Sequence, residues 1–114
     1  MRRRGLLLAT AAAALAAPVA APAAQAPTIA TVTMREWRFT VAPRTVPAGT
    51  VVFRVTNAGT IRHNFVVAGK RTRALSPGRS QVLRVTFRRP GPKAYLCTLP
   101  SHAEAGMRGR VSVG

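Results

Sequence analysis

An all-β fold, a Greek-key β-sandwich of seven to eight strands, is predicted by the distribution of apolar and turn-forming residues. Short runs rich in valine and threonine alternate apolar with polar residues, the period of strands with one buried face. Clusters of Gly, Pro or Asn separate these runs at intervals of about 8–12 residues, as in sandwich proteins. With 114 residues, of which 47% are hydrophobic, the chain has room for one such domain.

Seven segments show this alternation, and turn residues bound each of them. In chain order they cover residues 28–33, 37–42, 51–55, 64–67, 82–88, 94–97 and 109–113. Prolines or the sequence Asn57-Ala58-Gly59 end the strands of the first half, and Pro-Gly pairs separate those of the second half. No segment after residue 26 has a helical period. The aromatic residues are assigned to the core, and they are Trp37, Phe39, Phe53, Phe65, Phe87 and Tyr95.

The first segment has the order of an export signal. Three arginines follow Met1, then an apolar, alanine-rich stretch, then small-residue sites for cleavage near residues 23–26. We expect residues 1–23 to be removed and residues 24–114 to form the domain, in the periplasm or elsewhere outside the cytoplasm. A retained membrane anchor is the alternative, because the apolar stretch is long enough to span a bilayer. Two prolines interrupt it, so no stable insertion of the mature domain is expected.

The charge balance is strongly basic. Eighteen Lys and Arg residues against two acidic ones give a net charge of +16, and loss of residues 1–23 would leave +13. Such a surface attracts acidic partners. Nucleic acid is not expected, because the basic residues are not interleaved with aromatic ones. We expect a monomer, and no enzyme, because the only carboxylates, Glu36 and Glu104, are too few and too far apart for paired acid–base catalysis.

The single cysteine, Cys97, cannot form an internal disulfide. An idle thiol outside the cytoplasm is open to oxidation, so Cys97 is expected to be buried, linked to a partner or bound to a metal. It ends a predicted strand and directly precedes the longest segment without strand character, Thr98 to Arg108, and His102 and Met107 follow it at intervals of five. The other histidine, His63, precedes Cys97 by 34 residues, at the start of a strand.

One thiolate, two imidazoles and one thioether form the donor set of a blue-copper site. Soft sulfur donors suit Cu(I), and imidazole also suits Cu(II), so one site can hold both states with little movement. The chain between Cys97 and Met107 must curl to bring these donors together, which Pro100, Ser101 and Gly106 would permit. Tetrahedral zinc is the alternative, because Cys and His ligate it well, although a thioether is a poor ligand for zinc.

The same residues resemble the cupredoxin family. The segment from Cys97 to His102 is similar to the azurin loop, and the spacing from His102 to Met107 is similar to that of plastocyanin. The segments 46–53 and 57–60 and the pair His63-Asn64 resemble the region before the first ligand. The resemblance covers roughly residues 30–114 and implies a cupredoxin-like sandwich.

The resemblance also implies the site. The copper ligands would be His63, Cys97, His102 and Met107, supported by Asn64 and Pro100. Asn64 would tie the two ligand loops together, and its backbone amide would donate to the Cys97 sulfur.

The function expected from this site is one-electron transfer between extracytoplasmic redox proteins, with His102 reaching a small apolar surface. A periplasmic copper chaperone or storage protein would use a similar donor set. A metal-free sandwich that binds an acidic partner is a further alternative.

Overall fold

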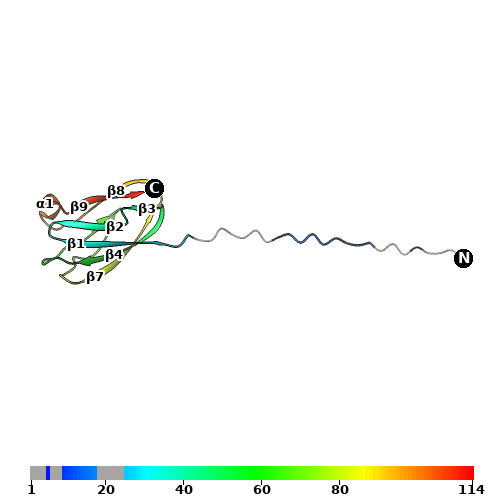
Figure 1. Ribbon diagram of the computed structural model, residues 1–114, viewed down its shortest axis with the longest axis horizontal. Coiled ribbons are helices and arrows are strands. Elements are labelled where there is room, and N and C mark those ends of the chain that lie inside the picture. The colour runs from blue at the N-terminus through cyan, green and yellow to red at the C-terminus, as the bar shows by residue number, and fades with distance from the viewer. Residues whose placement is uncertain (1–4, 6–8, 18–24) are drawn as a thin grey trace.

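The computed structural model describes residues 5, 9–17 and 25–114 of the chain (Figure 1). The signal arginines and most of the expected cleavage region lie outside these residues, so cleavage stays a prediction. Residues 9–17 are irregular and exposed. Within the described ranges, no helix has the length and apolar character needed to cross a membrane.

Two β-sheets make up the domain. Over the described residues the strands are β1 (Thr28–Arg35), β2 (Arg38–Ala42), β3 (Thr45–Val46), β4 (Gly49–Asn57), β5 (Val66–Val67), β6 (Lys70–Arg71), β7 (Ser80–Phe87), β8 (Gly91–Leu96) and β9 (Arg108–Val113). One sheet has the order β2-β1-β4-β7 and the other the order β3-β9-β8-β5-β6. β1 pairs in parallel with β4, and β3 with β9, while the remaining pairs are antiparallel. The prediction of an all-β sandwich is confirmed.

The structure has more strands than the seven to eight expected. β3 and β6 are two residues long, too short for an alternating pattern to be visible in the sequence. A four-residue helix, α1 (His102–Ala105), also forms in the segment between β8 and β9. One turn of helix is shorter than a helical period can reveal in a sequence.

The core lies between the two sheets and follows the alternation of the strands. In β4, Val51, Phe53 and Val55 are buried while Arg54 and Thr56 are exposed. Rings from both sheets meet there, with the centroids of Phe39 in β2 and Tyr95 in β8 5.3 Å apart.

The core assignment of Trp37 is wrong. It lies in the turn between β1 and β2, and 42% of its surface is exposed. The alternation of Phe39 and Val41 belongs to β2, which begins only at Arg38. Four of the other aromatic residues are buried as predicted, and Phe39 packs against the core from a partly buried position.

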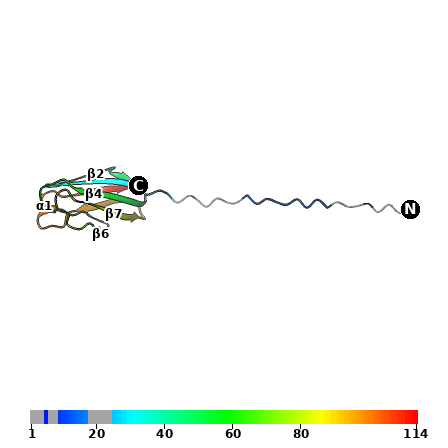
Figure 2. The same cartoon turned by 90° about the horizontal axis from the view of Figure 1, so that it is seen from below.

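Three connections meet at one end of the sandwich. They are the β1–β2 turn, the segment between β4 and β5, and the segment between β8 and β9 that contains α1. Figure 2 shows α1 at this end and the C-terminus at the opposite end of the domain. The candidate ligands are carried by the second and third of these connections.

Candidate metal centre

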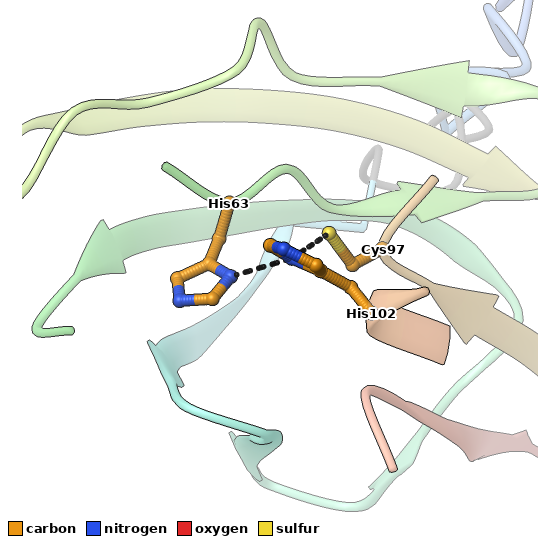
Figure 3. Close-up of side chains that lie close together, drawn as sticks. All are labelled: His63, Cys97 and His102. Atoms are coloured by element: carbon orange, nitrogen blue, oxygen red, sulfur yellow. Dashed lines mark hydrogen bonds between the residues drawn. The ribbon is translucent and has the colours of Figure 1, made fainter. Parts of the chain in front are cut away.

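Three of the four predicted donors converge. Nδ1 of His63 lies 3.2 Å from Nδ1 of His102, which in turn lies 3.4 Å from Sγ of Cys97. One ligand atom from each of the three residues lies within 4.8 Å of the others. Figure 3 shows the side chains pointing toward one another, His102 from α1 and Cys97 from just beyond β8. Residues distant in sequence therefore form one cluster, as expected.

The backbone of His63 is fixed from outside the cluster. Its N–H donates to the carbonyl of Leu75 at 3.2 Å, and the N–H of Leu75 donates back to its carbonyl at 2.8 Å. The side chain has no exposed surface. The position of this imidazole therefore depends on β-type pairing, not on a free loop.

The segment from Cys97 to Met107 is closed by its own backbone. The N–H of Cys97 donates to the carbonyl of Met107 at 3.0 Å, and the N–H of Met107 donates to the carbonyl of His102 at 3.1 Å. Ser101, with a φ of 69°, precedes α1, and Gly106, with a φ of 128°, follows it. These bonds and turns give the curl that three donors at intervals of five residues require.

Met107 is fully buried and linked through its backbone to two of the converging residues. This placement agrees with a role for its thioether as the fourth copper ligand, which stays a prediction. Cys97 is likewise buried, with 1% of its surface exposed. A buried thiol next to two imidazoles is shielded from oxidants in the medium.

Asn64 ties the two ligand-bearing segments together, as the resemblance implies. Its Oδ1 accepts a hydrogen bond from the N–H of Thr98 at 2.8 Å, and its Nδ2 donates to Oγ1 of Thr98 at 2.7 Å. The expected bond from the Asn64 amide to the Cys97 sulfur stays a prediction. Pro100 is exposed in the turn before α1, so a supporting role for it also stays a prediction.

One residue of the site was missed from the sequence. Oε1 of Glu36 lies 3.0 Å from Nε2 of His63 and also accepts hydrogen bonds from the N–H groups of Thr60 at 2.7 Å and Ile61 at 3.0 Å. These bonds, that from Thr60 first, lower the pKa of Glu36 to about 2. The site therefore contains a carboxylate that is ionised at neutral pH. A single Glu between two predicted strands gave no signal of this role.

Trp37 lies beside both imidazoles. Its ring meets that of His102 edge-on, with centroids 4.8 Å apart, and lies 6.2 Å from that of His63. His102 is only partly buried, and burial together with the nearby His63 lowers its pKa. A depressed pKa keeps the ring neutral, which is the form that ligates metals.

The donor distances fit a single metal ion. Metal–nitrogen and metal–sulfur bonds of about 2.0–2.3 Å allow two donors of one ion to lie no more than about 4.6 Å apart. The two separations that involve His102, 3.2 and 3.4 Å, fall within that limit, and the three ligand atoms together lie within 4.8 Å of one another. Two imidazoles and a thiolate, with a buried thioether in the same segment, form the soft and borderline donor set that suits copper.

Comparisons with known proteins agree with this geometry. The sequence matches the cupredoxin-like domain family over residues 5–111. A search of curated protein sequences finds no match.

Several solved structures share the fold. Dithionite-reduced auracyanin from the photosynthetic bacterium Roseiflexus castenholzii superposes with a TM-score of 0.66 at 24% identity, covering 80% of this chain and 99% of that one. An azurin from the methylotroph Methylomonas sp. strain J gives 0.62 at 14% identity, covering 78% and 99%. A multicopper oxidase gives 0.65 at 16% identity, covering 80% of this chain but 45% of that one. At these identities the likeness concerns the fold.

The family match spans most of the sequence, and the fold and donor set agree with it. The chain therefore belongs to the cupredoxin-like domain family, with copper as its cofactor.

Proposed function

We propose that His63, Cys97, His102 and Met107 hold one copper ion and that the domain is an extracytoplasmic one-electron carrier. The observation that supports this most directly is the convergence of two imidazole nitrogens and one cysteine sulfur within 4.8 Å. Bound copper would supply a one-electron Cu(I)/Cu(II) couple.

The chain's own contribution is rigidity. The pairing of His63 with Leu75 and the backbone bond between Cys97 and Met107 hold donors from both segments in place. Donors that move little between the two oxidation states make electron transfer fast, because little of the surroundings has to reorganise. Burial of His63, Cys97 and Met107 also keeps water away from three of the four donors.

A carrier is favoured over an enzyme. Four protein donors around one ion would leave no position for a substrate, whereas a catalytic metal keeps one open. The multicopper oxidase that shares the fold is more than twice as long as the matched region.

A copper chaperone or storage protein remains the second candidate from the donor set. The full burial of Met107 and the near-full burial of Cys97 favour retention of the metal over its delivery, because an acceptor must reach the ligands to exchange them. A high-affinity Cu(I) chelator added to the loaded protein separates the two. A carrier should keep its copper over hours, and a chaperone should lose it rapidly.

Sequence features support the proposed location and partner. The basic, apolar and small-residue order of residues 1–26 supports export. The basic surface supports a redox partner with an acidic face.

The copper site is tested by adding Cu(II) to the purified metal-free protein and recording the visible spectrum and the voltammogram. An intense sulfur-to-copper charge-transfer band and a reversible one-electron wave are expected. The band should vanish in Cys97→Ala and persist, with a shifted potential, in Met107→Leu. Absence of the band from the wild-type protein would rule out the blue-copper assignment, and a colourless zinc complex of higher affinity would favour zinc.

A further inference from the structure

Among the described residues, Glu36 is the one carboxylate with a hydrogen bond to the site, and one of its oxygens faces three donors. Oε1 of Glu36 lies within 3.0 Å of Nε2 of His63 and of the amide nitrogens of Thr60 and Ile61. The imidazole has no exposed surface, and the carboxylate side chain is 25% exposed. The chain has two acidic residues against eighteen basic ones, so this pairing is not a by-product of an acid-rich surface.

The segment before His63, from Asn57 to Ile61, packs closely against this carboxylate. A Cβ at Gly59 would lie 2.5 Å from Oε1 of Glu36, so any other residue would push the carboxylate out of this position. Asn57 holds the same segment, because its Oδ1 accepts from the N–H of Gly59 at 2.9 Å and its Nδ2 donates to the carbonyl of Ile61 at 2.8 Å. The two amides that donate to Glu36 are therefore presented by a fixed turn.

The contact assigns a role to each nitrogen of His63. An ionised carboxylate only accepts, so Nε2 must carry the hydrogen that points to Glu36. In the neutral ring Nδ1 is then the unprotonated nitrogen, and it is the one that lies 3.2 Å from Nδ1 of His102. A hydrogen bond at the outer nitrogen fixes the tautomer and ring orientation of a ligating histidine.

We propose that Glu36 is a positioning residue that selects the Nε2–H tautomer of His63 and lowers the reduction potential of the bound copper. The second part rests on the proposed copper site. An anionic acceptor makes the imidazole a stronger donor, and a stronger donor favours Cu(II) over Cu(I). Trp37 completes the same turn, with its ring beside both imidazoles.

The tautomer is tested in the metal-free protein, so that this part does not depend on copper. ¹⁵N-correlated NMR of the histidine rings should show His63 protonated at Nε2 in the wild type. Glu36→Ala, which removes the acceptor, should give a mixture of tautomers. Protonation at Nδ1 in the wild type, or an unchanged tautomer in a folded Glu36→Ala variant, would overturn the assignment.

The potential is tested in the copper-loaded protein with charge-matched variants. Glu36→Gln keeps an acceptor oxygen but removes the charge, and should shift the equilibrium with a reference couple about tenfold toward Cu(I), equivalent to 59 mV for one electron. Glu104→Gln removes the same charge from exposed α1 and should shift it less than about twofold. Equal shifts in the two variants, or none in Glu36→Gln, would overturn the proposal.

Gly59→Ala gives a second route to the same result without changing the carboxylate. The added methyl displaces Oε1 from Nε2 of His63, so the potential should rise in the same direction as in Glu36→Gln. An unchanged potential, in a variant whose amide NMR spectrum shows that the segment has shifted, would count against the proposal. A wild-type protein that binds no copper would instead refute the proposed function, while the tautomer measurement would still decide the role of Glu36.

Discussion

At the scale of single residues, the site depends on a glycine, Gly106, at a position where a side chain would collide with a neighbouring segment. Gly106 follows α1 with a φ of 128°, and a Cβ there would lie 2.8 Å from the carbonyl oxygen of Trp37. The glycine thus combines a backbone conformation that other residues rarely adopt with close contact to the β1–β2 turn. The ligand segment and the turn can approach each other only because this position has no Cβ.

Replacement of Gly106 by alanine should therefore destabilise the domain by about 2–4 kcal/mol, from backbone strain plus the clash. Urea unfolding of the metal-free protein measures the change. Gly78→Ala is the matched control, because Gly78 has a φ of 81° but nothing within 4 Å of an added Cβ. Strain alone should cost about 1 kcal/mol there. Equal losses in the two variants would show that the contact with Trp37 is unimportant.

Glu36 gives a prediction for the dependence of stability on pH. Its pKa is about 2 in the folded protein against an ordinary value of 4.5. Because the folded value is the lower one, the carboxylate stabilises the folded state fully above its unfolded pKa, and the stabilisation is lost as pH falls from about 4.5 toward 2.

The measurement is the free energy of unfolding of metal-free wild type and Glu36→Gln at a series of pH values. The difference between the two proteins should be constant near neutrality and shrink as the pH is lowered below about 4.5. A difference that does not change down to the onset of acid unfolding would contradict the hydrogen bonds described for Glu36.

At the scale of elements, the two ligand-bearing segments are joined by Asn64 and Thr98. Asn64 is 6% exposed, and its side chain makes two hydrogen bonds to Thr98, one with the backbone N–H and one with the hydroxyl. Its replacement by alanine should cost about 1–3 kcal/mol, because the N–H of Thr98 loses its acceptor. Thr98→Val removes only the hydroxyl and should cost less, about 0.5–1.5 kcal/mol. Thermal or urea unfolding of both variants checks this order, and a larger loss in Thr98→Val would reverse the interpretation.

The elements also show what could be predicted from the sequence. The longer strands were found because valine and threonine alternate over five or more residues, and the donor cluster because Cys and His are rare in this chain and spaced regularly. Trp37 was misplaced because the alternation continues by chance through a turn. Glu36 was missed because its partner His63 is 27 residues away and no local pattern connects them. Contacts made by one side chain across a turn depend on how the sheets pack, which the sequence pattern does not encode.

At the scale of the whole molecule, the dominant property is positive charge. Residues 24–114 carry thirteen arginines and two lysines against two glutamates. Among the described residues the one pair of oppositely charged or chargeable side chains in contact is that of Glu36 and His63, and it includes no arginine. The arginines are therefore available to attract an acidic partner over a distance, an interaction screened beyond about 10 Å at 0.1 M salt.

Electron transfer to an acidic redox partner should accordingly slow about tenfold or more between low and physiological ionic strength. Stopped-flow kinetics with the copper-loaded protein measures the rate over a salt series. A neutral small-molecule reductant serves as the control and should show little dependence. If the rate with the protein partner is equally indifferent to salt, charge does not guide the encounter.

The position of β9 has a consequence for how the domain is made. This strand lies between β3 and β8, yet it comes last in chain order among the described strands of the domain. A nascent chain that has reached only α1 would therefore have two unpaired sheet edges, which are templates for aggregation. Because Met107 directly precedes β9, pairing of β9 with β8 also brings Met107 back beside Cys97, so the sheet and the ligand segment are completed by the same step.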